Sequence, residues 1–501
     1  MMRSLFRFLS LTMPALVLSA GCTTLGPDYR EPEPEIATIW MEYEDPLIDT
    51  DSAVASDWWA ATFSDPVLNE LVATAIKDNL SVRSAGLRVL QARQQLAIAI
   101  GNQYPQQQDV SGSAEKARSN DRTEELYDIG FSVSWEADVW GRFRRQIESA
   151  SALLDANVAS YDGVVISLIA DVAQNYLLIR TTQQRLGYAR ENVRLQRQSV
   201  EITTAKFEAG ATSSLDVEQA STLMFNTVAS VADLELTLAQ LQNSLAVLLG
   251  RPPQDLTPLL GATQPVPEPE PEVAVGMPQD LIRRRPDIRV AERQLAAQSA
   301  QVGFAITDLY PHFGFTGSIG STANTGLNQD YDDLFSDDTF RYSIAGGFQW
   351  DILNYGRLRS NVRLQDAFFQ QLLEDYRQTV LSAQADVENT IVGYLKAQQQ
   401  LKALRAAAES AQRASDISSI QYQDGLITFN TVINTLTALA DQQDQLAASE
   451  GNVATRLVDV YRAIAGGWDV RQTSDPVDLI PEETREEMQE RTKYWNRTFD
   501  D

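Results

Sequence analysis

The chain has 501 residues and a formal net charge of −27, with 68 acidic against 41 basic side chains. Nucleic-acid binding needs basic surface, so this balance argues against a nucleic acid as a partner. A single histidine, His312, excludes HExxH metal sites and leaves only a chance Ser-His-Asp arrangement, and there is no GxxxxGK[ST] phosphate loop. We therefore expect no enzyme, no catalytic residues, no metal site and no cofactor.

The first 21 residues have the features of a secretory signal: Arg3 and Arg7, an apolar stretch over 8–18, and small residues before Cys22. This arrangement resembles a bacterial lipoprotein signal, in which the cysteine becomes the acylated N-terminus. The resemblance implies a covalent lipid on Cys22, and Thr23 in place of Asp favours the outer membrane. Residues 22–501 then carry 39 basic and 68 acidic side chains, a net charge of −29, and the only cysteine is acylated, so no disulfide can form.

Residues 22–57 are acidic and contain proline, as in Glu31-Pro32-Glu33-Pro34-Glu35, which predicts an extended tether. A helical pattern follows from Trp58 to about Ile100. Beyond the signal no apolar run approaches 18 residues, so we expect no transmembrane helix.

Two segments, about 105–138 and 311–352, have a different pattern, in which apolar and small or polar residues alternate. A period of two predicts strands with unlike faces. Each strand would have about ten residues, enough for a tilted strand to cross a bilayer. The acidic connection over 332–338 suits an exposed loop.

Very long helices are predicted after each strand pair. No proline lies between Pro105 and Pro252, or between Pro311 and Pro476, and proline breaks helix interiors. Residues 142–208 would form one helix of roughly 100 Å at 1.5 Å per residue. Apolar residues recur every seven positions, which indicates helices packed side by side with a left-handed supercoil.

The heptad pattern occurs twice. The apolar series from Val165 to Phe207 recurs 215 residues later, from Val380 to Tyr422. We infer a first repeat over 58–250, a Pro/Glu-rich spacer over 251–278, a second repeat over 279–467 and an acidic tail over 468–501.

Glycines and charged residues at the junctions have simple structural interpretations. Gly210 and Gly425 would end the two long helices before return helices at about 213–249 and 428–465. Trp140-Gly141-Arg142 and Tyr355-Gly356-Arg357 are interpreted as strand-to-helix turns, and Arg283-Arg284-Arg285 as partners of nearby acids rather than as a ligand site.

One copy of this chain cannot be complete. Four strands are too few for a membrane barrel, and an open sheet edge in lipid leaves backbone groups without partners. The heptad helices likewise need neighbours on both sides. An oligomer with a composite barrel and a helical tube would satisfy both needs.

The chain resembles the outer-membrane efflux lipoproteins related to TolC and OprM, the NodT-type family. The matching segments are Cys22-Thr23-Thr24-Leu25-Gly26-Pro27-Asp28-Tyr29, Trp58-Trp59 with Asp65-Pro66, and Asp280-Leu281-Ile282-Arg283-Arg284-Arg285-Pro286-Asp287-Ile288-Arg289 followed by Tyr310-Pro311. The resemblance covers nearly the whole of residues 22–501, in order.

This resemblance implies a fold that is mainly α with a membrane β-barrel. Three copies would share a 12-stranded outer-membrane barrel and a long-helix periplasmic α-barrel, with an equatorial belt formed by the N-terminal, spacer and C-terminal segments. The function implied is a passive exit duct of a tripartite pump for small molecules. Its partners would be a periplasmic membrane-fusion adaptor, an inner-membrane RND-type transporter and outer-membrane lipid.

The resemblance also assigns roles at the two helix tips. Adaptor docking would fall on Gly210, Ala211, Gly425 and Leu426. Aperture positions would be Asp216, Tyr422, Thr431 and Asn434, of which the last two stand where the family often has acids. Ile427 stands where the family has an arginine partner, and we expect a less acidic aperture with weaker block by cations.

Three functions are compatible with these features. The first is small-molecule efflux, the second the outer-membrane channel of a type I protein-secretion system, and the third a structural lipoprotein without a pore. A plain coiled-coil scaffold would explain the helices but not the paired strands.

Overall fold

The computed structural model describes residues 23–50, 52, 54–119, 122–269, 272–280, 284–467, 469, 471 and 474–495. The chain divides into two compact units. Of the described residues, those within 23–33, 88–158 and 290–378 form the first unit, and those within 34–87, 159–289 and 379–495 form the second. Each unit therefore contains segments from both halves of the sequence.

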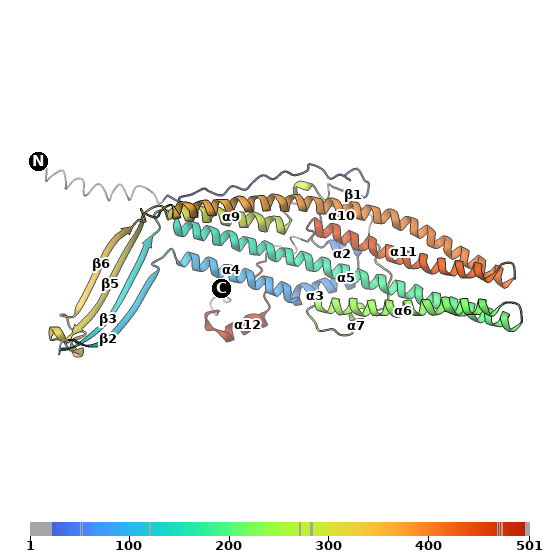
Figure 1. Cartoon of the computed structure of the whole chain (residues 1–501), viewed down its shortest axis with the longest axis horizontal. Helices are drawn as coiled ribbons and strands as arrows, with labels where there is room; N and C mark the ends of the chain where they lie inside the picture. Colours follow the sequence, from blue (N-terminus) through green and yellow to red (C-terminus); the bar gives the residue numbers. More distant parts are fainter. Residues whose placement is uncertain are drawn as a thin grey trace. The chain divides into compact units, whose positions relative to one another are not determined.

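The first unit holds a four-stranded antiparallel sheet in the order β2-β3-β5-β6 (Figure 1). Its strands are β2 (Gln107–Ser119), β3 (Arg122–Ala137), β5 (His312–Asn324) and β6 (Phe340–Gln349). The predicted strand pairs are confirmed, and β2, β3 and β5 are longer than the ten residues expected. The central pairing joins β3 to β5, with Phe131 opposite Ile319 and Trp135 opposite Phe315.

The two outer strands of this sheet are exposed along their length. Every residue of β6 is exposed, and so are the residues of β2 through Arg118. Apolar side chains such as Val110, Ile344 and Phe348 alternate with small or polar residues, as a sheet with two unlike faces requires. An apolar face without a partner implies an apolar surrounding or further copies of the chain.

Two pairs of antiparallel helices dominate the rest of the chain. The helices are α5 (Arg142–Glu208), α6 (Ser214–Leu248), α10 (Arg357–Gln423) and α11 (Phe429–Ala463). The 67-residue helix predicted over 142–208 is confirmed, and α10 has the same length. Both hairpins turn at the same end of the picture (Figure 1).

Shorter elements complete the two units. The helices are α2 (Trp58–Phe63), α3 (Pro66–Asp78), α4 (Leu80–Gly101), α7 (Thr257–Leu260), α9 (Pro286–Thr307) and α12 (Glu482–Arg491). Two short strands, β1 (Ile48–Asp49) and β4 (Val273–Ala274), pair in parallel. Single 3-10 turns are η1 (Pro278–Asp280), η2 (Thr325–Leu327), η3 (Tyr331–Asp333) and η4 (Lys493–Trp495).

Local capping explains where α3 and α4 begin. The Asp65 carboxylate accepts hydrogen bonds from the backbone N–H groups of Val67 and Leu68, and Pro66 occupies the first helical position. The Asn79 side chain likewise accepts from Ser81 and Val82. These caps satisfy N–H groups that have no partner inside the helix.

One helix is apolar enough over part of its length to meet the composition test for a membrane span. Within α5 there is an 18-residue stretch whose mean hydropathy is 1.4, apolar and long enough to cross a membrane by composition. Half of that stretch is buried in the protein, and it includes the fully buried Val172, Tyr176 and Ile179. A core helix passes the same test, so this stretch is explained by packing within the second unit.

Several side chains of the N-terminal tether and of the Pro/Glu-rich spacer are buried. Trp40 is buried and its indole N–H donates to the Gly276 carbonyl at 2.8 Å, within the second unit. Val266, Val273 and Val275 of the spacer are buried as well. The sequence did not predict burial at these positions, where isolated apolar residues among the prolines and acids pack onto the helical core.

Residues 24–29 contact the rest of the first unit at several points. Arg145 is buried and donates to the carbonyls of Leu25 and Gly26 and to the Asp28 carboxylate, at 3.0–3.2 Å. Gly26 has φ +91°, and a Cβ there would lie 2.4 Å from the Cα of Gly303. The segment that follows Cys22 is thus held by a buried guanidinium, while Cys22 itself lies outside the described residues.

Candidate functional site at the hairpin tips

Both hairpin turns have the same backbone geometry. The N–H of Ala211 donates to the Lys206 carbonyl at 2.7 Å and that of Gly210 to Phe207 at 2.9 Å; Leu426 and Gly425 donate to Gln421 and Tyr422 in the same way. This pair of bonds is the Schellman ending of a helix. Gly210 and Gly425 have φ of +75° and +76°, so glycine is required by conformation, although a Cβ would meet open space.

An apolar cluster lies just behind these turns. It consists of Ala220, Tyr422, Phe429, Val432 and Leu436, with Ile202, Leu223 and Ile427 packed against it. The rings of Tyr422 and Phe429 lie 5.3 Å apart. Because the cluster draws side chains from α5, α6, α10 and α11, it holds the two tips together in one chain.

Lys206 joins the ends of α5 and α10. Its ammonium donates to the Tyr422 carbonyl at 2.6 Å and lies 4.0 Å from the centre of the Tyr422 ring. The carbonyl is one of the last of α10, where a cation is favourable because of the helix dipole. A cation therefore contacts Tyr422 from the first repeat, although Ile427 replaces the arginine that the resemblance implied.

The Tyr422 phenol is enclosed beside the first turn of α6. Its oxygen is buried, and burial raises the pKa of Tyr422; the nearby Asp216 carboxylate raises it further, while the Thr212 hydroxyl opposes the change. Thr212 also donates to Asp216 in a short hydrogen bond. The phenol is consequently neutral and protonated at any physiological pH.

The remaining predicted tip residues are exposed. Thr431 and Asn434 lie in the first turns of α11 and face solvent, three residues apart on one helical face. Gly210, Ala211, Gly425 and Leu426 are exposed too, and the Leu426 side chain is an apolar group at the extreme end of its turn. The structure thus brings Tyr422 near Asp216 but leaves Thr431 and Asn434 open to the surroundings.

Sequence reasoning missed the contact made by Lys206. The signal lay in a difference between the repeats, because the residue four positions before the turn glycine is Lys206 in the first repeat and Gln421 in the second. Only the folded chain shows that this cation reaches the aromatic ring of the other repeat.

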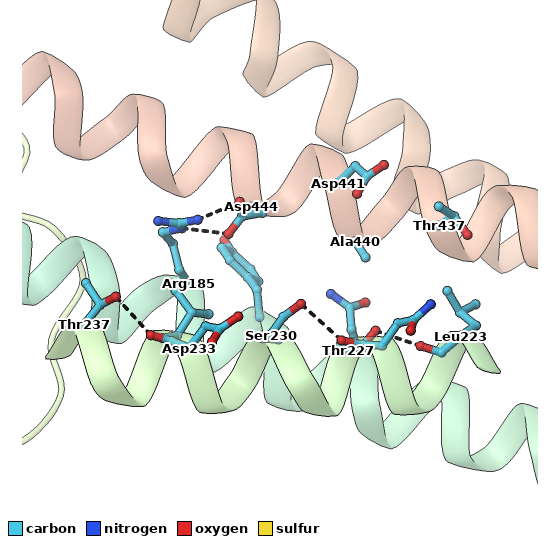
Figure 2. Close-up of a pocket in the computed structure, with 15 residues that line it drawn as sticks. Arg185, Leu223, Thr227, Ser230, Asp233, Thr237, Thr437, Ala440, Asp441 and Asp444 are labelled. Atoms are coloured by element: carbon cyan, nitrogen blue, oxygen red, sulfur yellow. Dashed lines mark hydrogen bonds and ion pairs between the residues drawn. The ribbon is translucent and has the colours of Figure 1, made fainter. Parts of the chain in front are cut away.

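A polar groove of about 530 Å³ lies between the hairpins, further from the tips (Figure 2). It is crossed by an ion pair in which Arg185 of α5 donates twice to the Asp444 carboxylate of α11, at 2.7 and 2.9 Å. Asp233 and Asp441 also line the groove, which is therefore acidic apart from Arg185.

Contacts between the hairpins change in character along the helices. Nearer the middle of the second unit many of the buried residues are apolar, as with Val172, Ile179 and Leu457. Toward the tips, Asn192 of α5 donates to Gln443 of α11 at 2.9 Å. Within the second hairpin, Ser418 of α10 is bonded to Thr435 of α11 at 2.6 Å. Polar contacts of this kind exchange partners, including water, at lower free-energy cost than apolar packing does.

Other predicted residues lie away from the tips. His312 begins β5 and its Nδ1 lies 2.8 Å from the Glu136 carboxylate. Gly141 and Gly356 have φ of +79° and +83° at the two strand-to-helix turns, as that interpretation requires. Arg284 pairs with Asp280, and Arg285 with Asp287 and Asp386, which confirms pairing with acids for these two arginines; Arg283 lies outside the described residues.

Comparison with known proteins gives one consistent result. The family described as "Outer membrane efflux protein" matches residues 71–251 and 277–466. Nodulation protein T of Rhizobium leguminosarum bv. viciae is 31% identical over 472 residues, covering 94% of this chain and 95% of that protein. The toluene efflux pump outer membrane protein TtgI of Pseudomonas putida is 29% identical, covering 93% of this chain and 100% of that protein.

A solved structure agrees with the sequence matches. The outer-membrane channel OprN superposes with a TM-score of 0.82 and 31% identity, over 89% of this chain and 99% of that one. The family match and the likeness to OprN place this protein in the outer membrane. The chain, with its TolC- and OprM-like architecture, therefore belongs to the outer membrane efflux protein family.

Proposed function

We propose that this protein is the outer-membrane exit duct of a tripartite efflux pump, a passive channel that carries small molecules from periplasm to exterior. The observation that supports the proposal best is the combination of 67-residue helices with a sheet whose outer strands are both exposed. Neither a scaffold nor an enzyme requires that combination, whereas a wall of a wide pore does.

The proposed assembly is a homotrimer. A membrane barrel cannot have open edges, because unpaired backbone groups in hydrocarbon each cost several kcal/mol. Three copies of the four-stranded sheet would give 12 strands, an even number within the range of bacterial barrels. The two repeats, proposed as 58–250 and 279–467, would then alternate around a common axis.

The tips are the proposed periplasmic end. Gly210, Ala211, Gly425 and Leu426 would receive the helical hairpins of an adaptor, since their small or apolar side chains leave the backbone accessible. Asp216, Tyr422, Thr431 and Asn434 would border the aperture. An inner-membrane RND-type transporter would supply the energy, and a lipid on Cys22 would anchor the N-terminus.

The cargo is proposed to be small molecules. TtgI, which this chain resembles along its length, is named for a toluene efflux pump. A wide aqueous tube has little surface with which to discriminate solutes, so selectivity would reside in the transporter.

Reconstitution into a planar bilayer tests the proposal. The mature protein should have the mass of three chains in detergent and produce discrete conductance steps at low nanomolar addition. A fully folded monomer without conductance would contradict the duct. Conductance together with export of a co-expressed protein substrate, and none of small molecules, would instead favour type I secretion.

A further inference from the structure

We infer that the contact between β3 and β5 within one chain is repeated between β6 of one copy and β2 of the next, with a register that places Ile344 opposite Lys116 of the neighbour. This inference deepens the proposed function, because it takes association of copies as given and specifies the surface and the alignment. The internal duplication supports it, because the two repeats of one chain already make the same kind of contact through their strands and through one aromatic pair.

The template is the interface between the two repeats of one chain. Across it, Ile129 of β3 lies opposite Ser321 of β5, and Trp135 lies opposite Phe315, with their rings 5.9 Å apart. Just beyond, Trp140 donates its indole N–H to the Pro311 carbonyl at 2.8 Å and packs on Tyr310 at 5.1 Å.

The strand pairing and the duplication show which residues of the two repeats are equivalent. The helices α5 and α10 begin 215 residues apart, at Arg142 and Arg357, and the same shift superposes Trp135 on Trp350 and Ile129 on Ile344. Val110 lies opposite Phe131, and Phe315 lies opposite Gly346, which is the residue equivalent to Phe131. Val110 and Phe315 are therefore equivalent, and so are Lys116 and Ser321.

The aromatic partners are equivalent too. Helix α4 ends at Gly101 and α9 ends at Thr307, and a Tyr-Pro pair begins three residues after each end. The Tyr104 N–H donates to the Gly101 carbonyl at 3.2 Å, and the Tyr310 N–H donates to the Thr307 carbonyl at 3.0 Å. Trp140 precedes Gly141 as Tyr355 precedes Gly356.

The two surfaces that would form this interface, one beside β6 and one beside β2, are exposed in the single chain. Strand β3 continues to Ala137, which pairs with Phe313 of β5. Strand β6 ends at Gln349, so the residues equivalent to the last residues of β3 are not in a strand. Ile352 and Leu353 are exposed there by 68% and 85%. The side chain of Tyr355, whose φ is +51°, is fully exposed, and that of Tyr104 is 65% exposed. Their equivalents, Trp140 and Tyr310, contact each other.

Applying the β3–β5 pairing to β6 and the neighbour's β2 gives each of these exposed residues a partner. Trp135 opposite Phe315 becomes Trp350 opposite the neighbour's Val110, and Ile129 opposite Ser321 becomes Ile344 opposite the neighbour's Lys116. The β6 face that carries Ile344 and Phe348 and the β2 face that carries Val110 then point the same way, whereas a slip of one residue would reverse one of them. Tyr355 would pack on the neighbour's Tyr104.

Paired cysteines test the register in the full chain, expressed and inserted in cells. Ile344→Cys with Lys116→Cys should form disulfide-linked dimers and trimers that a reductant dissolves. Directly opposite Cα atoms lie ~4.5–5.5 Å apart, within the disulfide range, whereas a shift of two residues gives about 7–8 Å, beyond it. The matched controls are Ile344→Cys with Ala114→Cys, Ile344→Cys with Arg118→Cys, and each single substitution, all in the background of Cys22.

The outcomes separate the register from the duct. If one of the control pairs cross-links, or if no pair cross-links in a trimer that conducts, the register is wrong but the proposed duct is not contradicted. A monomer that neither cross-links nor conducts would overturn both.

The aromatic contact has its own test. Tyr355→Ala and Tyr104→Ala should each lower the temperature at which the assembly dissociates in mild detergent, and the double variant should lower it no further, because one contact is lost in each case. Tyr494→Ala, at another exposed tyrosine, should leave that temperature unchanged. Additive losses, or no loss, would contradict packing of Tyr355 on Tyr104.

Discussion

At the scale of single residues, Lys206 supplies the positive charge at the hairpin tips that Ile427 does not. The family resemblance implies an arginine at position 427, but the chain has Ile427, which packs against the apolar cluster around Phe429. Lys206 supplies the cation from the other repeat and contacts the Tyr422 carbonyl and ring. Residue identity at one position was therefore a poor guide to the charge present at the site.

Lys206→Met should loosen the tip while keeping most of the side chain's apolar stem. Loss of a charged hydrogen bond and a cation–π contact should cost about 1–2 kcal/mol, or roughly 5–30-fold in local opening. Amide hydrogen exchange of residues 421–427 should accelerate by that factor. Lys402→Met, at an exposed lysine of α10, should leave exchange at the tip unchanged. Equal acceleration in both variants would argue against a specific contact.

Restoring acids at the aperture should change the response of the channel to divalent cations. Thr431 and Asn434 are exposed in the first turns of α11, where acids are also favoured by the helix dipole. Thr431→Asp with Asn434→Asp should increase block of conductance by Mg²⁺ in a titration across the bilayer. Ala438→Asp, further along α11, is the control, and unchanged block in the double variant would mean that these residues do not border the aperture.

At the scale of elements, close approach of helices depends on a few small residues. Gly451 of α11 faces Thr181 of α5, and a Cβ on Gly451 would lie 2.0 Å from the Thr181 hydroxyl oxygen. The heptad pattern predicted that long helices pack side by side, but it contained no information on which glycine would meet which side chain.

Gly451→Ala should destabilise the helical core by about 1–3 kcal/mol, because the added methyl group overpacks the α5–α11 contact. Chemical denaturation of the detergent-solubilised protein measures the change, and Thr181→Ala should restore part of it. Gly187→Ala on α5 is the matched control, since nothing lies within 4 Å of its Cβ position; it should stabilise by about 0.5–1 kcal/mol. Destabilisation by Gly187→Ala as well would indicate a general effect of the substitution.

At the scale of the whole molecule, the single chain leaves large apolar side chains exposed on one sheet and its turn, among them Ile344, Phe348, Leu353 and Tyr355. Soluble monomers rarely tolerate a surface of this kind. The same incompleteness was predictable from the sequence, because four strands cannot close. Which strands meet across the repeats was not predictable, since β3–β5 pairing joins residues nearly two hundred positions apart.

If assembly covers this surface, stability should depend on protein concentration. A tenfold dilution should lower the midpoint of thermal dissociation by about 1–2 °C, because association stabilises the folded chain by mass action. Light scattering during a thermal ramp at two concentrations, with detergent concentration held constant, measures the shift. A midpoint that does not respond to dilution would contradict reversible association of copies.

The sequence by itself determined the long helices, the four strands, the duplication and the two glycine turns, because periodicity, proline spacing and left-handed turn positions are local properties of a chain. It failed for Trp40 and the valines of the spacer, whose burial depends on distant surfaces. Only the tertiary structure decided that Lys206 meets Tyr422, that Gly451 meets Thr181 and that β3 pairs with β5. A heptad repeat leaves the rotation of each helix about its axis open, and that rotation is settled when all the helices and strands pack at once.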